Sequence, residues 1–217
     1  MNRTYEPGNL IQEMRIVNIS RDQIGHAAGI LTRAFENDPL FRYIFPSRKK
    51  YLRLAPWLFS TWIRWAILYG RAWMTEDGNG VVLLRSPSML FFSFPDMLRT
   101  GMLQTPFRIG LKSFKRLYFE VARMLYKKHC EKMGDQPHWY GWMIGVYPAS
   151  KGIGRDLLKH CFEITDKDEL PIYIETTTVQ NVNLYQYKGF TFIEEIFIGK
   201  ERTPVYLMIR QPTREKE

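Results

Sequence analysis

The sequence has few of the residues that build metal and disulfide sites. Among its 217 residues there are two cysteines, Cys130 and Cys161, and four histidines. Neither cysteine has the spacing of a metal site or a redox pair, so we expect no metal centre. The chain also shows no signal peptide, no apolar run long enough to span a membrane and no internal repeat. These absences argue against disulfide-rich and membrane-spanning classes and favour a protein of the reducing cytoplasm.

Acidic residues are the scarcer charge, with 22 Asp and Glu against 31 Lys and Arg and a net charge of +9. Such an excess is typical of proteins that bind anionic ligands, nucleic acid or a membrane surface. The basic residues are scattered and no nucleic-acid motif is present, so we expect neither a nucleic acid nor a membrane as partner. The amphipathic stretch from Leu111 to Tyr126 could lie on a membrane, but such a helix more often packs on its own domain.

The most informative stretch, residues 138–160, predicts a strand, a glycine loop and a helix. Residues 138–147 are apolar on both faces, which is typical of a strand in the middle of a sheet. Pro148 should end this strand because it cannot donate to a ladder. The loop Lys151-Gly152-Ile153-Gly154 then opens a helix, where unpaired N–H groups and the helix dipole suit a phosphate. A tight turn without a ligand is the alternative.

Patterns elsewhere predict the remaining elements. A capping box at Ser20 and Gln23 marks the start of a helix, and another helix follows Pro46 and stops at Gly70. Residues 86–137 are rich in Phe, Met and Arg and predict a helical insertion that could wall a substrate pocket. The predicted strands are residues 14–19, 71–75, 81–85, 171–176, 191–198 and 205–210, with a short helix over 180–188. Glu175 interrupts an apolar strand, so it is either a site residue or a strand-end carboxylate facing water.

These motifs together resemble the GNAT superfamily of N-acetyltransferases, and more narrowly its puromycin N-acetyltransferase-like branch. The resemblance covers roughly residues 136–211. It implies an α/β (α+β) fold with a mixed, mostly antiparallel sheet, a splayed central strand and flanking helices, in a single domain over 1–217 with the insertion at about 86–137. The matching residues are His138-Trp139-Tyr140, Ile144-Gly145-Val146, Pro148, Gly152-Ile153-Gly154, Ile174-Glu175-Thr176-Thr177, Asn181, Leu184-Tyr185 and Gly189-Phe190.

The resemblance implies acetyl-CoA as cosubstrate and an amine-bearing small molecule or peptide as acceptor. It leaves a monomer and a homodimer open. The residues it assigns to coenzyme A are the backbone of Ile144, Gly145 and Val146 for the pantetheine arm, Lys151, Gly152, Ile153 and Gly154 for the pyrophosphate, and Asn181 for the arm again. The loop after Pro148 is about two residues shorter than the family pattern, and Ala149 stands where Gln or Arg is expected. Lys151 and Arg155 could supply the charge instead. The alternative is a non-catalytic relative that only binds a ligand or partner.

The transferred reaction needs a base for the amine, a donor for the oxyanion and an acid for the leaving thiolate. The resemblance places Tyr185 near the thioester sulfur, so we expect its hydroxyl to be the acid. The alternative for Tyr185 is a core aromatic. Glu175 is the candidate base, with His138 as the other choice unless that histidine is structural. The Val146 N–H is the expected oxyanion donor, and Asp38 could attract a cationic amine.

Overall fold

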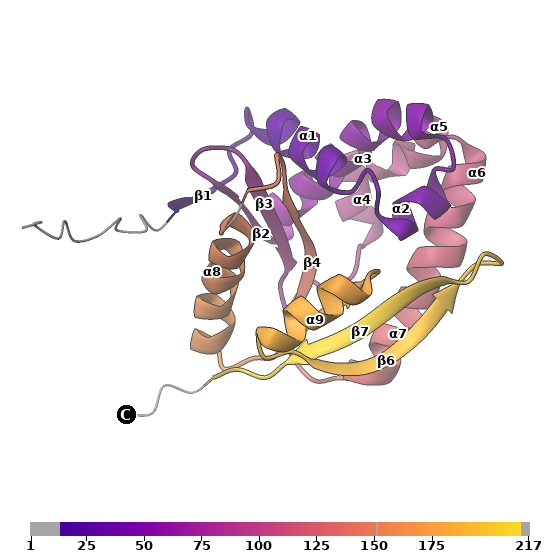
Figure 1. The fold of residues 1–217 in the computed structure, drawn as a ribbon. Coiled ribbons are helices and arrows are strands. Elements are labelled where there is room, and N and C mark those ends of the chain that lie inside the picture. Colours follow the sequence, from indigo (N-terminus) through magenta and orange to yellow (C-terminus); the bar gives the residue numbers. More distant parts are fainter. Residues whose placement is uncertain (1–13, 151, 214–217) are drawn as a thin grey trace, which may run out of the picture.

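One mixed sheet organises the molecule (Figure 1). The computed structural model describes residues 14–150 and 152–213. In the described chain, seven strands run in the order β1-β2-β3-β4-β5-β7-β6, and every neighbouring pair is antiparallel except β4 with β5. The predicted mostly antiparallel sheet is therefore confirmed, with β4 at its centre. The strands are β1 (Ile16–Asn18), β2 (Gly70–Thr75), β3 (Gly80–Arg85), β4 (Trp139–Val146), β5 (Ile172–Thr176), β6 (Thr191–Ile198) and β7 (Thr203–Arg210).

The central strand is paired along most of its length on one side only. Pairing with β3 continues to Val146, which lies opposite Gly80. Pairing with β5 ends at Gly141, opposite Ile174. The β3–β4 register shifts at this point, with Trp142 as the extra residue of β4. Because a bulge bends and twists its strand, β4 diverges from β5 beyond Gly141, which is the predicted splay.

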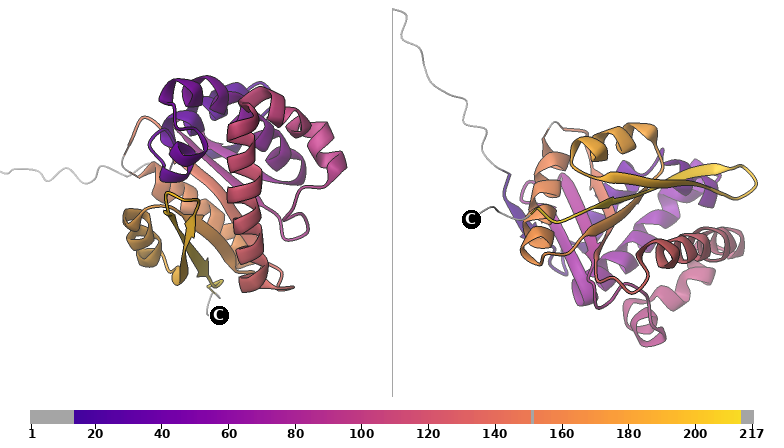
Figure 2. Two further views of the ribbon diagram at one scale, coloured as in Figure 1. Left: turned by 90° about the vertical axis from the view of Figure 1, so that its right-hand side faces the viewer. Right: turned by 90° about the horizontal axis from the view of Figure 1, so that it is seen from below.

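Helices cover both faces of the sheet and give each face its own core (Figures 1 and 2). One face carries α1 (Ile24–Ala34) and α3 (Arg48–Tyr69), and the other carries α8 (Ile153–Lys167). The helix α9 (Val179–Tyr187) contacts β6 and adds Val182 and Tyr185 to the α8 core. Gly145 lets β4 approach α1 closely, because a Cβ on it would lie 2.9 Å from the Cβ of Ala34.

The predicted insertion is helical and lies between β3 and β4. Its helices are α4 (Phe94–Thr100), η1 (Met102–Gln104), α5 (Thr105–Ile109), α6 (Leu111–Phe114), the π-helix η2 (Lys115–Ala122) and α7 (Arg123–Met133). Within the amphipathic stretch from Leu111 to Tyr126, Leu117 and Val121 are buried, but Leu111 and Tyr126 at its two ends are 75% and 53% exposed. The stretch does not keep one apolar face because the π-helical bonds of η2 change the rotation per residue.

One short helix was not predicted from the sequence, and the predicted capping box at Ser20 and Gln23 is only half formed. The helix α2 (Pro39–Ile44) begins directly after Asp38, a residue pair with Pro39 that can also end a helix: Asp38 Oδ1 accepts from the N–H groups of Leu40 and Phe41 at 2.9 and 3.1 Å. An Asp before a Pro serves a helix start equally well. The Gln23 side chain accepts from the Ser20 N–H at 3.0 Å, but the helix itself starts at Ile24.

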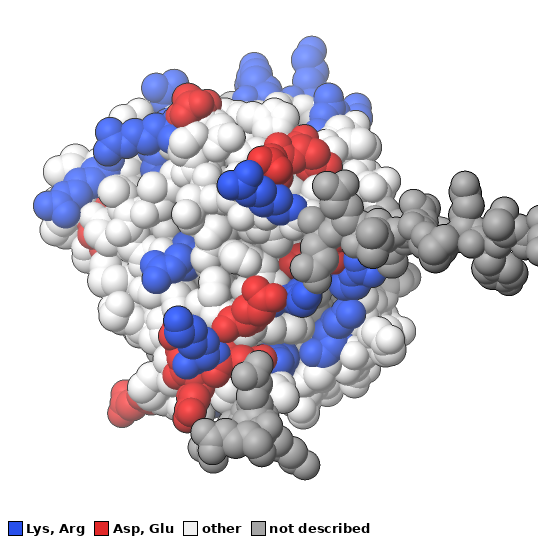
Figure 3. All heavy atoms as spheres, turned by 90° about the vertical axis from the view of Figure 1, so that its left-hand side faces the viewer, with Lys and Arg blue, Asp and Glu red and all other residues white. Residues whose placement is uncertain are grey.

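The surface charge does not gather on the face shown in Figure 3, where basic and acidic side chains are interspersed. None of the described helices is long and apolar enough to cross a bilayer. Within residues 14–150 and 152–213, no group of three or more metal-ligating side chains is found.

Candidate active site

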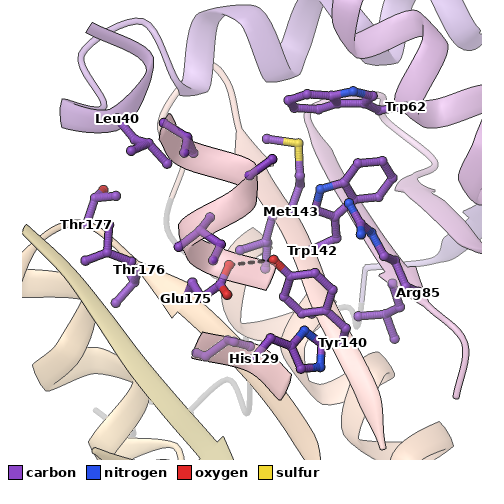
Figure 4. A pocket seen from close by; sticks show the side chains of 18 of the residues that line it. Leu40, Trp62, Arg85, His129, Tyr140, Trp142, Met143, Glu175, Thr176 and Thr177 are labelled. Carbon is purple, nitrogen blue, oxygen red and sulfur yellow. Dashed lines mark hydrogen bonds between the residues drawn. The ribbon is translucent and has the colours of Figure 1, made fainter. Parts of the chain in front are cut away.

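A cavity of about 480 Å³ runs through the place where β4 and β5 separate. On one side of the sheet it is lined by Glu175, Trp62 and helix η2 of the insertion; on the other it is lined by Leu158 of α8 and Tyr185 of α9. We call these the insertion side and the α8 side. Residues on both faces of the sheet therefore border one continuous space, part of which is seen in Figure 4.

The registers of three neighbouring strands build the insertion side. Arg85 on β3 lies opposite Tyr140 on β4, and Tyr140 lies opposite Tyr173 on β5. Paired residues project from the same face, and so does the residue two positions further along a strand. Arg85, Tyr140, Tyr173 and Glu175 therefore share one face, and Figure 4 shows Tyr140 and Glu175 pointing at each other.

The Glu175 carboxylate lies at the centre of this group. It accepts from the Tyr140 hydroxyl at 2.5 Å and from the Tyr173 hydroxyl at 3.2 Å. Burial raises the pKa of Glu175, while the two hydroxyls and the charge of Arg85 oppose that shift. A carboxylate whose pKa is moved toward neutrality is suited to accept a proton. Glu175 lines the cavity, so it is not the solvent-facing strand end that the sequence left open.

Arg85 lines the same side of the cavity and lies among aromatic rings. Its guanidinium carbon is 3.9 Å from the centroid of the Trp142 ring, 4.3 Å from Phe92 and 5.0 Å from Tyr140. Nη1 donates to the Leu90 carbonyl at 3.0 Å, whereas Nε is buried without a partner. Burial lowers the pKa of Arg85 to about 10, so the side chain stays charged at neutral pH.

Two buried histidines lie next to this cluster. His129 and His138 join through their Nε2 atoms at 2.5 Å, and His138 Nδ1 bonds the Gln136 carbonyl at 2.6 Å. The carbonyl can only accept, so His138 donates from Nδ1 and His129 donates the proton between the two rings. Burial lowers the pKa of both, that of His129 to about 4. His129 stacks on Tyr173 and lines the cavity, whereas His138 does not, which favours the structural interpretation of His138.

On the α8 side, Tyr185 comes from α9 and is 8% exposed. Its ring packs on Phe190 with the centroids 5.3 Å apart, and it also lines the cavity. Burial raises the pKa of Tyr185 to about 12, so the hydroxyl keeps its proton at neutral pH. Asn181 lies one helical turn earlier, in the first turn of α9, and lines the same cavity.

The glycine loop lies at the start of α8, as predicted. Gly152 has φ +97° and precedes the first helical residue, Ile153. A Cβ on Gly154 would meet only Val146 Cγ2, at 3.9 Å, so packing within the described chain does not require a glycine there. The Arg155 side chain pairs with Asp156 at 2.8 Å. Lys151 lies outside the described residues.

This arrangement fits the shape and chemistry of coenzyme A. The start of a 15-residue helix offers N–H groups and a positive dipole to a pyrophosphate. Beside it, β4 from Trp142 to Val146 has no partner on the β5 side, and Ile144 of this segment lines the cavity. Unpaired strand edges of this kind bind an extended, amide-containing arm.

Sequence reasoning missed Arg85 and Tyr173 and did not assign Tyr140 to the site. A signal was available for Arg85, which ends an otherwise apolar strand. Asp38 does line the cavity, but its two oxygens are already bonded, one to backbone N–H groups and Oδ2 to the Thr177 hydroxyl at 2.5 Å.

Known proteins are similar to this chain in sequence and in fold. No model of a known protein family matches the chain. An uncharacterized N-acetyltransferase of Schizosaccharomyces pombe is 26% identical over 199 residues, which cover 88% of this chain and 81% of the relative. A histone acetyltransferase HPA2-related structure from Corynebacterium glutamicum has a TM-score of 0.62 at 19% identity, with 95% of this chain and 100% of that chain covered. Arylalkylamine N-acetyltransferase 2 of Aedes aegypti has a TM-score of 0.63 at 15% identity, covering 93% and 100%.

The two structures share the fold, and the yeast relative adds likeness in sequence over most of the chain. The narrower puromycin-like branch stays a prediction. With the splayed central strand and the glycine loop in place, the chain has the fold of the GNAT acetyltransferases and is similar in sequence to an N-acetyltransferase.

Proposed function

We propose that the protein transfers the acetyl group of acetyl-CoA to a primary amine. One observation carries this proposal: a single cavity crosses the sheet between β4 and β5 and has chemically different sides. The α8 side is bordered by the unpaired strand edge at Ile144, and the N-terminus of α8 lies outside the cavity lining beside that edge; both suit the cosubstrate. The insertion side has a carboxylate in an otherwise largely apolar wall, which suits an amine. Two substrates that enter from opposite sides would meet in the gap.

On the α8 side, we propose that the backbone of Ile144, Gly145 and Val146 holds the pantetheine arm. The loop from Lys151 to Gly154 would hold the pyrophosphate, with Arg155 beside it and Asn181 on the arm. The open space at Gly154 supports this, since a ligand can fill a volume that the protein leaves free. Bound there, acetyl-CoA would supply the activated acetyl thioester.

On the insertion side, Glu175 would take the proton that a protonated amine must lose before it attacks. Its raised pKa and its place in the cavity support that role. Holding the amine and the thioester in line supplies much of the rate. Tyr185, protonated at neutral pH and on the other side of the gap, would donate a proton to the leaving sulfur. The two proton transfers would thus take place on opposite sides of the sheet.

A direct assay tests the proposal. The protein is incubated with acetyl-CoA and a panel of primary amines, and both free thiol and acetylated amine are followed. We expect thiol release that depends on the amine, with one acetylated product for each thiol. The short loop after Pro148 motivates a second candidate, a non-catalytic member that only binds a ligand or partner. It would release no thiol with any amine.

A further inference from the structure

Arg85 is a charged group that the reaction described above does not use. It lines the insertion side of the cavity, together with Glu175. Across the described ranges, no carboxylate lies within ion-pair distance of Arg85. Buried charges in proteins are normally paired with an opposite charge. An unpaired guanidinium in a cavity wall therefore needs an explanation.

Aromatic rings compensate for only part of this burial. Trp142, Phe92 and Tyr140 lie within 5.0 Å of the guanidinium carbon, and each ring face attracts a cation. A ring face does not replace the hydrogen bonds of a guanidinium, which has five donors. Nη1 has the Leu90 carbonyl, but Nε has no partner. The site is therefore incomplete without an acceptor of hydrogen bonds, and an anion would supply both the bonds and the charge.

The positions of Arg85 and Glu175 indicate the size of a ligand that could contact both side chains. Arg85 is on β3 and Glu175 is on β5, the two strands that flank β4. Neighbouring strands lie about 4.8 Å apart, so the backbones of β3 and β5 are about 9.6 Å apart, and Glu175 lies two residues, about 7 Å, further along its strand than the row of Arg85. Both side chains line the same cavity, so one ligand could reach both through charge-assisted hydrogen bonds of about 2.8 Å each. An α-amino acid, which carries its ammonium and its carboxylate on the same carbon, is the smallest common ligand with both groups.

The remaining wall suits an apolar side chain. The insertion and the segment before it contribute large apolar residues to this side of the cavity: Phe91, Phe92, Leu117, Val121 and Leu125. The charged residues on the described lining are Asp38, Arg85 and Glu175, and Asp38 is occupied as the N-cap of α2. Glu175 is therefore the one carboxylate of the described lining that does not cap a helix, whereas a polyamine would require a second carboxylate for its distant amine.

We propose that the acceptor is an α-amino acid with an apolar side chain, whose carboxylate binds Arg85 and whose amine faces Glu175. This inference rests on the proposed acetyltransferase function. Arg85 is then a specificity-determining residue: it holds the end of the acceptor that does not react. The planar guanidinium can hold a carboxylate through two parallel hydrogen bonds.

Matched acceptor pairs test the inference in the wild-type protein. Each pair consists of an amino acid and the amine that lacks its carboxylate: L-phenylalanine and phenethylamine, L-tryptophan and tryptamine, L-leucine and 3-methylbutylamine. A site built for a polar group discriminates strongly against the analogue that lacks it. We expect kcat/KM to favour the amino acid by about 100-fold or more in at least one pair. Equal or better use of the amine in every pair would overturn the inference.

Two variants and one control assign the preference to Arg85. Arg85→Met keeps the aliphatic stem and removes the charge, so the preference should fall by about 100-fold or reverse. Arg85→Lys should keep part of it. Arg71→Met is the matched control, because Arg71 is an exposed sheet residue 5.7 Å from the Trp139 ring and does not line the cavity. An unchanged preference in folded Arg85→Met would show that the carboxylate binds elsewhere.

An equilibrium measurement keeps the test independent of catalysis. The product N-acetyl-L-phenylalanine retains the carboxylate, and N-acetylphenethylamine lacks it. In calorimetry, the wild type should bind N-acetyl-L-phenylalanine at least tenfold more tightly than N-acetylphenethylamine. The Arg85→Met variant should bind the two compounds with similar affinity. A protein that binds acetyl-CoA and acetylates only amines without a carboxylate would overturn this inference and leave the proposed function standing. A protein that does not bind acetyl-CoA would overturn the proposed function itself.

Discussion

The two sides of the cavity are built in different ways. The α8 side is lined by side chains such as Leu158 and Tyr185, but the groups beside it that suit a cosubstrate are mainly backbone: the unpaired edge of β4 and the start of α8. The insertion side consists of side chains from β3, β4 and β5 under the helices of the insertion. Backbone groups can bind a cosubstrate that never changes, whereas side chains can be exchanged to suit a new acceptor. The comparison indicates that the α8 side determines the reaction class and the insertion side determines the acceptor.

On the α8 side, Tyr185 is the residue that we expect to take part in the reaction itself and not only in binding. Replacing it with Phe removes the hydroxyl and keeps the ring that packs on Phe190. If the hydroxyl protonates the thiolate, kcat should fall by about 10² to 10⁴. Acetyl-CoA affinity should barely change, because the interaction is made in the transition state. Steady-state rates with parallel calorimetry measure both. A joint loss of binding and kcat would instead support the core-aromatic alternative.

Glu175→Gln tests the chemistry of the insertion side. We expect kcat/KM to fall by about 10²-fold with acetyl-CoA affinity unchanged, because the base belongs to the acceptor. The pH profile gives a second readout. Burial raises the pKa of Glu175, so wild-type kcat/KM should rise with pH through a value above the ordinary range of about 4.3. The Gln variant should lack that rise. An acid limb that persists in the variant would contradict the assignment.

The histidine pair makes the insertion side sensitive to acid. The pKa of His129 in the folded state is lowered to about 4, below the unfolded value. Its stabilising contribution is therefore complete above about pH 6.5 and is lost as the pH falls from 6.5 toward 4. The expected loss is on the order of 2 kcal/mol. Urea unfolding at several pH values measures it. His129→Gln should flatten this dependence.

Gly154→Asp tests whether phosphate binds at the start of α8. A carboxylate there would repel a pyrophosphate and occupy the space that the glycine leaves, so acetyl-CoA affinity should fall about tenfold, roughly 1.4 kcal/mol. The fold should survive, because a Cβ at Gly154 meets nothing closer than 3.9 Å. Gly25→Asp is the matched control: Gly25 is also the second residue of its helix and has nothing within 4 Å. Equal affinity in both variants would place the phosphates elsewhere.

The local elements beside the α8 side could be predicted from the sequence, whereas the residues that meet on the insertion side could not. Strand, glycine loop and helix are local patterns, so Gly152 and Ile153 could be placed at a helix start from neighbouring residues, and the role of Tyr185 stays a prediction from the resemblance. Arg85 and Tyr140 become neighbours only through the register of β3 with β4, which joins residues 55 positions apart (140 less 85). Local patterns do not contain that register.

The helices also show which features local sequence patterns can predict and which they cannot. The long helix α3 follows from its apolar period and its flanking Pro46 and Gly70. The short helix α2 depends on the cap from Asp38, and an Asp-Pro pair is compatible with a helix end or a helix start. The π-helix η2 changes the rotation per residue, which an analysis with a fixed period of 3.6 cannot anticipate.

Titration of acetyl-CoA into the wild-type protein, followed by calorimetry, tests the central claim most directly. The claim is that the gap between β4 and β5, with the start of α8, forms a cosubstrate site despite the short loop. We expect saturable binding of one acetyl-CoA per chain with a Kd in the micromolar range, about −8 kcal/mol. The absence of any binding at millimolar acetyl-CoA, in a protein shown to be folded, would contradict the account and favour the non-catalytic alternative.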